Sequence, residues 1–372
     1  MTGNRKLNIA ILTSNENAYS ETFIQAHRER LDGNIYFFYG GTIPNQIEGS
    51  PIKTSPIFRA FYKAIGNYTT DFLLFEKKAL GLALRKHRID VVLAEYGPIG
   101  AQATPICKSL NLPLIVHFHG YDATQLKILE TYSSRYKAMF EYVVKVIAVS
   151  SEMLQQLKLL GCPEKKLCLN PYGPHEDFVD LEPAFSELLL LTVGRFTNKK
   201  APYYVVLAFA KALKNYPEAK LIMAGNGPLK ESCENLVRYL DIQSNVTFPG
   251  VISPEEFRNF LSKSRGFIQH SIRSKDGDME GTPVAILEAS GAGLPVISTK
   301  HGGIMDVIIH EETGYLVDEH DVIGMTDCIV KILEDRTLAV KLGANGKERI
   351  SQKFSMSRHI DEINRIIRHA SK

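Results

Sequence analysis

Short apolar runs alternate with longer segments of helical periodicity along most of the chain. The first apolar run, residues 7–13, is short and mostly apolar, which predicts a buried strand. Strands that alternate with helices predict a parallel sheet with crossover connections. In the N-terminal half the pattern predicts further strands at 34–39, 89–95, 112–118, 144–149 and 166–169, and helices at 20–30, 57–88 and 97–110.

The alternation restarts after a break in the middle of the chain. Residues 170–174, Asn-Pro-Tyr-Gly-Pro, interrupt regular structure, and the acidic stretch 176–187 is interpreted as a linker. Beyond it the pattern predicts strands at 188–193, 220–224, 245–248, 266–270, 294–298 and 314–317, and helices from about 201, at 283–291, at 321–335 and from 337 onward. The sequence therefore predicts an α/β protein of two Rossmann-like domains with a cleft between them.

Length and composition agree with this organisation. Single hydrophobic cores rarely exceed ~250–300 residues, so 372 residues predict about two domains. A content of 44% hydrophobic and 23% charged residues excludes the disordered and fibrous classes. The net charge of +3 is too small to indicate a nucleic-acid partner, although it is compatible with weak attraction to an anionic membrane.

Basic side chains gather on the predicted helical segment between residues 53 and 88. Such a segment is most often a solvated face, and docking to a membrane or to a lipid diphosphate is the alternative. The residues are Arg59, Lys63, Lys77, Lys78, Arg85, Lys86 and Arg88.

The cysteines and the termini bear on the compartment. The five cysteines are scattered, and none forms a Cys-x-x-Cys pair, so we expect reduced thiols and no zinc site. The polar first residues lack the apolar core of a signal peptide, and no apolar run reaches the ~18 residues that span a bilayer. We therefore expect a cytoplasmic protein, with peripheral contact at the inner face of the membrane as an alternative.

One stretch, residues 277–289, carries the most chemistry. In it Glu280 and Glu288 bracket Gly281-Thr282-Pro283-Val284, and a Thr before a Pro is typical of an N-cap followed by the first helical position. A helix that starts there would present free N–H groups to an anion. Glu280 would lie in the preceding loop and Glu288 more than one turn inside the helix. Amides for a phosphate and carboxylates for hydroxyls together predict a nucleotide-activated sugar as ligand.

Further candidates follow predicted strands. In doubly wound sheets, ligands bind beyond the carboxyl ends of the strands, so these residues are expected along the edge that lines a cleft. Arg195 and Lys200 are the best groups to offset the charge of a diphosphate, and glycines allow close approach of the backbone. No Asp-x-Asp stands at a strand end, so no metal or other cofactor is expected. The other strand-end candidates are His119, Gly225, Asn226, Gly302 and Gly303.

Each candidate also has a simpler interpretation. Two glutamates eight residues apart occur often by chance, and an Arg after a Gly is usually a solvated group. His119 could be a buried structural histidine, His117 is expected to be one, and His270 and His301 stay undecided. An epimerase or phosphorylase on the same fold remains an alternative, because fold does not determine function. A non-catalytic sugar-binding protein is an alternative of another class.

These motifs resemble those of retaining glycosyltransferases of the GT-B fold, specifically glycosyltransferase family four. The resemblance rests on Glu280-Gly281-Thr282-Pro283 with Glu288, on 193–200 (Val-Gly-Arg-Phe-Thr-Asn-Lys-Lys), on 295–306 with its paired glycines, and on His119 within His-Phe-His-Gly-Tyr-Asp. Residues 20–24 and 277–281 are most similar to the subgroup that builds bacterial exopolysaccharide, such as colanic-acid transferases. The resemblance covers nearly the whole chain.

The resemblance implies specific roles. Residues 1–176 would bind the acceptor, residues 187–354 would bind the nucleotide sugar, and the helix of 355–372 would cross back to the N-terminal domain. Transfer would be retaining and metal-independent, from a nucleotide-diphosphate sugar to a glycan or lipid-diphosphate-linked acceptor. In this scheme Arg195 and Lys200 stabilise the diphosphate, Glu280 holds sugar hydroxyls and Glu288 holds the ribose. Amides near Thr282, Val284, Gly302 and Gly303 would contact phosphate.

The chain departs from the family pattern at three places. Residues 14–19 lack the Gly-Gly loop that many members carry after the first strand, so phosphate contacts are not expected there. Ala201 replaces the usual Gly after the lysine, and Asp306 stands where Glu is usual. Neither substitution changes the interpretation of the main motifs.

Overall fold

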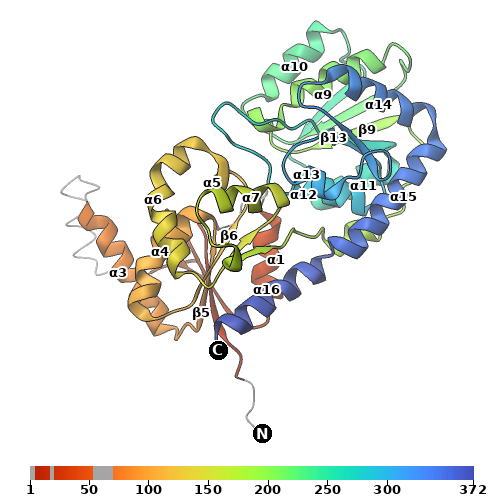
Figure 1. Ribbon diagram of the computed structural model, residues 1–372. Coiled ribbons are helices and arrows are strands. Elements are labelled where there is room, and N and C mark those ends of the chain that lie inside the picture. Colours follow the sequence, from red (N-terminus) through yellow and green to blue (C-terminus); the bar gives the residue numbers. More distant parts are fainter. Residues whose placement is uncertain (1–4, 17–20, 53–69) are drawn as a thin grey trace. The chain divides into compact units, whose positions relative to one another are not determined.

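The computed structural model describes residues 5–16, 21–52 and 70–372, with backbone only at 70–74. Within these ranges the chain forms two compact units (Figure 1). Unit 1 comprises residues 1–149, 153–170 and 360–372, and unit 2 comprises 150–152 and 171–359. The C-terminal residues from Ile360 therefore belong to the N-terminal unit.

Unit 1 is built on an eight-stranded sheet in the order β4-β3-β2-β1-β5-β6-β7-β8. The adjacent strands in the part β2-β1-β5-β6-β7-β8 are parallel. The pairs β2/β3 and β3/β4 are antiparallel. The central strands are buried on both faces, as expected where helices cover a parallel sheet. The strands are β1 (Asn8–Leu12), β2 (Asn34–Tyr39), β3 (Gln46–Ile47), β4 (Ser50–Pro51), β5 (Val91–Glu95), β6 (Leu114–Phe118), β7 (Lys145–Ala148) and β8 (Leu167–Leu169).

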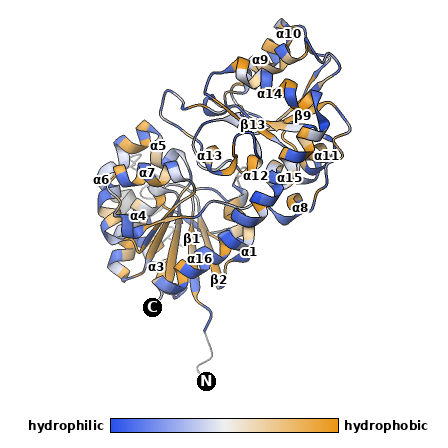
Figure 2. Ribbon diagram, turned by 45° about the vertical axis from the view of Figure 1, so that its right-hand side comes forward, coloured by the Kyte–Doolittle hydropathy of each residue, from blue (hydrophilic) through white to orange (hydrophobic). Residues whose placement is uncertain are grey.

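Helices connect these strands and cover the sheet. Buried faces of α1, α4 and α6 carry apolar side chains, and Figure 2 shows orange strands within a shell of mixed helices. The helices of this part are α1 (Thr22–Arg30), α3 (Thr70–Lys86), α4 (Gly97–Leu110), α5 (Tyr121–Thr124), α6 (Leu126–Tyr142), α7 (Ser151–Leu159), the 3-10 turn η1 (Glu164–Lys166) and α16 (Met356–Ala370).

Unit 2 has a six-stranded parallel sheet in the order β11-β10-β9-β12-β13-β14. Numbered within the unit, this is 3-2-1-4-5-6, the order of the Rossmann fold. The strands are β9 (Leu189–Val193), β10 (Lys220–Ala224), β11 (Val246–Gly250), β12 (Gly266–Ile268), β13 (Val296–Thr299) and β14 (Gly314–Val317).

Helices lie on both sides of this second sheet, with α9, α10 and α14 on one side and α11, α12 and α15 on the other (Figures 1 and 2). The helices are α8 (Glu176–Val179), η2 (Asn198–Lys200), α9 (Pro202–Ala212), α10 (Lys230–Tyr239), α11 (Pro254–Lys263), α12 (Val284–Gly291), α13 (Ile304–Val307), α14 (Val322–Glu334) and α15 (Arg336–Lys353).

Each sheet reverses its strand order at one point, and ligands of such folds bind beyond the strand ends there. In unit 1 the reversal lies between β1 and β5, and in unit 2 it lies between β9 and β12. Glu95 is the last residue of β5, while Gly194 and Arg195 directly follow β9. The fold thus places Glu95 at the switch point of unit 1 and the predicted site residue Arg195 at the switch point of unit 2.

The predicted α/β class with two Rossmann-like sheets is confirmed. The linker prediction for 176–187 is wrong, because Glu176–Val179 forms α8 and the rings of Phe178 and Phe185 are buried in unit 2. The Lys347 ammonium also donates to the Leu181 carbonyl, which fixes this stretch to α15. The pattern did not identify α6, α7, α10 or α11. The basic residues Arg59 and Lys63 lie outside the described residues.

Candidate active site

The centre of the candidate site in unit 2 is an ion pair between Lys200 and Glu280. Lys200 ends η2, which follows β9, and Glu280 lies in the loop between β12 and α12. The Lys200 Nζ lies 3.1 Å from Glu280 Oε1, and only 8% of Glu280 is exposed. Two groups that the sequence assigned to separate parts of a ligand therefore contact each other in the free protein.

A second ion pair lies beside the first. The buried Lys199 Nζ is 3.1 Å from Asp278 Oδ1 and donates to the Met279 carbonyl at 3.4 Å. Adjacent lysines thus hold two acids of one loop. Lys199 and Asp278 both lie within the motifs of the sequence, but no role was predicted for either. The parallel spacing of Lys199-Lys200 and Asp278-x-Glu280 is the signal that would have suggested it.

These pairs determine the charge of the site. Burial alone would raise the pKa of Glu280, but the positive charges of Lys200 and Lys199 outweigh it and lower the pKa to about 2. Burial lowers the pKa of Lys200, and Glu280 opposes this shift. Glu280 is therefore a carboxylate at neutral pH, able to accept hydrogen bonds from hydroxyl groups.

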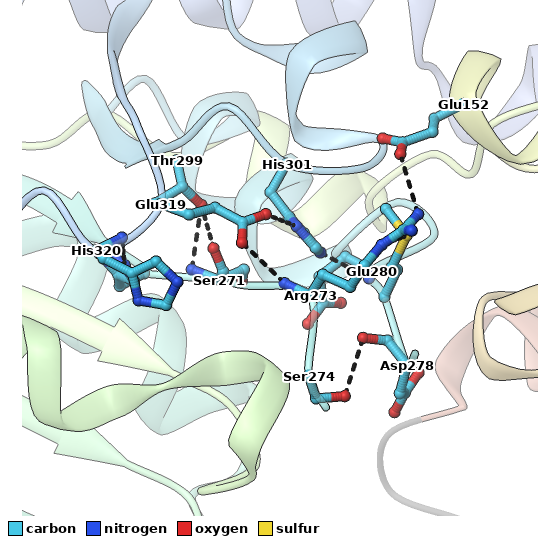
Figure 3. Close-up of polar contacts among 12 residues, drawn as sticks. Glu152, Ser271, Arg273, Ser274, Asp278, Glu280, Thr299, His301, Glu319 and His320 are labelled. Carbon is cyan, nitrogen blue, oxygen red and sulfur yellow. Dashed lines mark hydrogen bonds and ion pairs between the residues drawn. The ribbon is translucent and has the colours of Figure 1, made fainter. Parts of the chain in front are cut away.

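The backbone of Glu280 is held by His301 (Figure 3). The Glu280 N–H donates to His301 Nε2 at 3.1 Å, and His301 Nδ1 lies 2.6 Å from Glu319 Oε1. Glu319 Oε2 accepts a further hydrogen bond from the Arg273 N–H at 3.0 Å. His301, which the sequence left undecided, therefore lies at the candidate site.

Gly302 and Gly303 pack against the same loop. A Cβ on Gly302 would lie 2.4 Å from the Glu280 carbonyl oxygen, and one on Gly303 would lie 2.0 Å from that of Gly281. The Gly303 N–H donates to Gly281 O at 2.7 Å. This amide was expected to bind phosphate, but it is engaged within the protein here, so a phosphate contact would require that bond to break.

Gly225 and Asn226 lie at the end of β10, next to the segment after β9. A Cβ on Gly225, whose φ is +130°, would lie 1.9 Å from the Gly194 carbonyl oxygen. The Phe196 N–H donates to the Asn226 carbonyl at 2.9 Å. The glycine therefore permits two loops to pack closely. Arg195, between the two contacts, is exposed, and no ion pair to it is found among the described residues.

Glu288 lies inside α12 and Glu280 in the preceding loop, as predicted. The predicted cap is shifted: Pro283 occupies the N-cap position, and its carbonyl accepts from the N–H groups of Ile286 and Leu287. Thr282 lies before the cap because Pro283 has an extended backbone. Burial raises the pKa of Glu288 to about 7.

The candidate residue of unit 1, His119, lies in a buried polar cluster after β6. Its Nε2 is 2.9 Å from Glu95 Oε2, and its ring stacks on Phe23 with centroids 4.5 Å apart. Glu95 also lies 2.7 Å from His27 Nδ1 and 3.4 Å from His117 Nδ1. Register explains the cluster, since Glu95 pairs with His117 across β5 and β6.

The cluster has a defined charge. Burial would raise the pKa of Glu95, but the three neighbouring histidines hold it well below its usual range. Burial lowers the pKa of His117 to about 3, so His117 is neutral. A structural role was expected for His117. Glu95 and His27 carry no signal in the sequence, since their proximity depends on the packing of α1 over the sheet.

Asp122 fixes the loop that carries His119. Its Oδ1 accepts hydrogen bonds from the N–H groups of His119 and Gly120, at 3.0 and 2.9 Å. Its Oδ2 accepts from the Gly97 N–H at 2.9 Å, which links the starts of α4 and α5. The His-Phe-His-Gly-Tyr-Asp motif therefore contains its own organising carboxylate.

Among the described residues, one group has ligand atoms close enough together to hold a metal ion: His27, Glu95 and His117, whose atoms lie within 4.8 Å of one another. The 2.7 Å contact between His27 and Glu95 is a hydrogen-bond distance, so a metal there would have to displace a proton. In unit 2 the candidate carboxylates Glu280 and Asp278 face lysines instead.

Two family models together match most of the chain. Residues 48–175 match the model described as Glycosyltransferase Family 4, and residues 176–349 match the one described as Glycosyl transferases group 1. The boundary between them lies close to the break after Asn170. No described helix is both long enough and apolar enough to cross a membrane.

Curated relatives are about a quarter identical to this chain over the aligned residues. The putative colanic acid biosynthesis glycosyltransferase WcaL of Escherichia coli is 28% identical over 240 residues, which are 63% of this chain and 59% of the relative. The amylovoran biosynthesis glycosyltransferase AmsK of Erwinia amylovora is 28% identical over 272 residues, 72% of this chain and 67% of the relative. The matched segment thus spans less than two thirds of the length of WcaL.

Solved structures share the fold over nearly the whole chain. Alr3699/HepE of Anabaena, solved with UDP and glucose, has a TM-score of 0.76 at 15% identity and covers 98% of this chain and 100% of its own. The sucrose-phosphate synthase of Thermosynechococcus elongatus has a TM-score of 0.76 at 21% identity, covering 98% and 99%. The similarity to these structures shows the GT-B fold that the sequence predicted.

Proposed function

Because the chain belongs to the glycosyltransferases with a family 4 and a group 1 domain, we propose that it moves a sugar from a nucleoside-diphosphate sugar to a hydroxyl group with retention of configuration. The observation that carries this proposal is the Lys200–Glu280 pair beyond the switch point of unit 2. It offers a cation for a diphosphate and an anion for sugar hydroxyls within one hydrogen-bond distance. HepE, which shares the fold, was solved with UDP and glucose.

In this scheme Lys200 and Glu280 bind different parts of the donor. The diphosphate attracts Lys200 and the exposed Arg195, while Glu280 accepts hydrogen bonds from the sugar. Glu288, half-buried in α12, accepts from the ribose, and the N–H groups of Val284 and Ala285 precede the first bonded amides of the helix. Charge develops on the diphosphate as it leaves, so cations placed there stabilise the transition state.

The reaction needs no protein nucleophile. The acceptor oxygen attacks the anomeric carbon from the face that the diphosphate leaves, the bond from that carbon to the phosphate oxygen breaks, and the acceptor proton passes to the departing phosphate oxygen. No metal ion takes part in this proposal, because lysine and arginine supply the positive charge. His119, fixed by Glu95 and Asp122, positions a sugar hydroxyl from unit 1.

The acceptor is proposed from the relatives. WcaL and AmsK are named for colanic acid and amylovoran biosynthesis, so we place this chain in the synthesis of a bacterial surface polysaccharide with a glycan or lipid-diphosphate-linked acceptor. Peripheral contact with a membrane through α3 belongs to the same proposal. An epimerase or phosphorylase would give different products, and a sugar-binding protein without turnover would give none.

The test compares Lys200→Ala with the matched control Lys230→Met, which removes a surface lysine paired with Glu234 in α10. A thermal-shift screen against UDP-, GDP-, ADP- and dTDP-sugars first identifies the donor, because a ligand at a hundredfold excess over Kd stabilises by roughly 2.7 kcal/mol. Release of nucleoside diphosphate is then measured with acceptor. We expect a loss of ~10²–10³-fold in Lys200→Ala and none in Lys230→Met. Equal turnover in both variants would refute the assignment.

A further inference from the structure

The loop between β12 and α12 carries Glu280, and both of its arms are tied to one acidic residue. Glu319, which follows β14, accepts from the Arg273 N–H in the first arm through Oε2. Through Oε1 it contacts His301, which in turn accepts from the Glu280 N–H in the second arm. Figure 3 shows this chain of contacts from Arg273 through Glu319 and His301 to Glu280.

The turn of the loop is closed by its own backbone. The Ser274 N–H donates to the Asp278 carbonyl at 3.1 Å, and the Gly277 N–H donates to the Ser274 carbonyl at 2.8 Å. Lys199 holds the Asp278 side chain from outside. The position of Glu280 relative to the strands is therefore set at the base of the loop, where Glu319 and His301 lie.

The partners of His301 determine its tautomer. The backbone N–H of Glu280 can only donate, so Nε2 must be an unprotonated acceptor. The Glu319 carboxylate can only accept, so Nδ1 must carry the proton. A histidine that is 1% exposed is thus held neutral and in one orientation by a donor on one side and an acceptor on the other.

Register brings the two residues together. β13 and β14 are parallel with Thr299 opposite Val317, and His301 and Glu319 each lie two residues beyond that pair. Neighbouring strand ends therefore present both side chains at the same edge of the sheet. Lys200 contacts Glu280 from the segment after β9, so the site is held from three strand ends.

We propose that Glu319 and His301 are positioning residues that fix the Glu280 loop for the donor sugar, with Glu319 setting the Nδ1–H tautomer of His301. This inference rests on the proposed role of Glu280 in sugar binding. Neither residue needs to contact the substrate. Without the carboxylate, His301 loses the partner that selects its tautomer, and a proton on Nε2 would face the Glu280 N–H and break that bond.

The first experiment reads the tautomer without any substrate. Long-range ¹H–¹⁵N correlation spectra of histidine-labelled protein at pH 7.5, with His301 assigned by its absence in His301→Gln, are expected to show a protonated Nδ1 and an unprotonated Nε2. Glu319→Gln and Glu319→Ala should lose this signature and speed hydrogen exchange at the Glu280 amide. Asp318→Asn, the matched control, removes the neighbouring exposed acid paired with Lys300 and should change neither.

The second experiment measures kinetics with the donor that the thermal-shift screen identifies. Loss of a single hydrogen bond corresponds to roughly three- to tenfold, and we expect a decrease of this size in kcat/KM for the donor in Glu319→Gln, more in Glu319→Ala, and none in Asp318→Asn. Melting temperatures confirm that each variant is folded.

Two results would overturn the inference: an Nε2–H or doubly protonated His301 in the unmodified protein, or unchanged Glu280 exchange and kcat/KM in both Glu319 variants. Failure of the proposed function looks different, because an inactive unmodified protein would still show the tautomer and the protected amide.

Discussion

Each unit buries one carboxylate at the switch point of its own sheet, and the two are neutralised by different partners. Glu95 of unit 1 is surrounded by His27, His117 and His119, whereas Glu280 of unit 2 is paired with Lys200. In both cases burial opposes ionisation and neighbouring groups outweigh it. Lysine remains charged across the physiological range, while histidine changes its charge between about pH 5 and 8.

The difference suits different tasks. A lysine can leave its carboxylate partner and bind an anionic ligand with a full positive charge, which supports the diphosphate-binding role that we propose for Lys200. Histidine partners donate hydrogen bonds in a fixed geometry. The unit 1 cluster therefore fixes the orientation of the His119 ring and does not supply a charge to a ligand. Five predictions test this contrast, in decreasing order of expected effect.

The largest effect is expected from Glu280→Ala. Removing one partner of a buried ion pair leaves an uncompensated charge, which typically costs ~3–5 kcal/mol in the free energy of unfolding. Turnover should fall by ~10²–10³-fold as well, because the sugar contact is lost. Urea unfolding and release of nucleoside diphosphate measure the two effects.

The double variant Lys200→Met with Glu280→Leu separates stability from function. It replaces both charges by apolar groups, so it should recover most of the unfolding free energy while remaining inactive. A double variant that recovers activity would show that the pair serves only the fold.

A smaller effect is expected from Glu95→Gln in unit 1. The pKa of Glu95 is lowered in the folded state, so its ionisation stabilises the fold above the unfolded-state pKa of about 4.3, and this contribution is lost as the pH falls below that value. The variant should be less stable at pH 7 by roughly 2 kcal/mol, the scale of charged hydrogen bonds, and should lose less stability on acidification.

Unfolding midpoints between pH 3 and 8 test this prediction. Asp90→Asn is a suitable control, because Asp90 is a half-buried acid of the same unit that pairs with the exposed Arg5 rather than with histidines. Parallel pH curves for Glu95→Gln and the unmodified protein would contradict a buried ionised Glu95.

Part of this contrast was predictable from the sequence. The strand ends, the positions of Glu280 and Glu288 relative to the helix, and His119 after β6 follow from local patterns of apolar residues and turn formers. The pairing of Lys200 with Glu280 spans 80 residues and depends on which strands are neighbours, so the matching spacing of Lys199-Lys200 and Asp278-x-Glu280 indicates it only once the strand order is known. The same holds for Glu95 and for Glu319, whose roles arise from register across β5/β6 and β13/β14.

Helix prediction failed for a related reason. Segments such as α10 mix charged and apolar residues, and the helical form of α10 is supported by its packing against α9. The short α8 was hidden by neighbouring acidic and proline residues, although the burial of Phe178 anchors it. Tertiary contacts determined these elements more strongly than local propensity did.

A modest effect is expected at Glu288. Its pKa is raised to about 7 by burial, so the folded state favours the protonated form, and stability falls as the pH rises from the unfolded value of about 4.3 through 7. Ribose hydroxyls that donate to the carboxylate favour its ionised form, so nucleotide binding near pH 7 should release a fraction of one proton.

Calorimetric titration with nucleotide in buffers of different ionisation enthalpy measures this release. Glu288→Gln should abolish it and, because Glu288 is partly solvated, should stabilise the ligand-free protein at pH 8 by only about 1 kcal/mol. Glu187→Gln provides a control acid that is exposed and lies outside α12. Proton release that persists in Glu288→Gln would assign the titration to another group.

Metal removal is expected to have no effect. This experiment distinguishes Glu280 from Glu95 most directly. Lysines compensate Glu280, so we expect the proposed donor site to need no cation, whereas His27, Glu95 and His117 have the ligand atoms that a transition metal prefers. We expect dialysis against EDTA to leave both turnover and the melting temperature unchanged. Loss of turnover restored by Mg²⁺ would contradict metal-independent transfer in unit 2. A different outcome would be a melting temperature that EDTA lowers and Zn²⁺ restores, with His117→Gln showing no such change. That result would show that the unit 1 cluster is a structural metal site, in which an ion takes the place of the hydrogen-bonded proton.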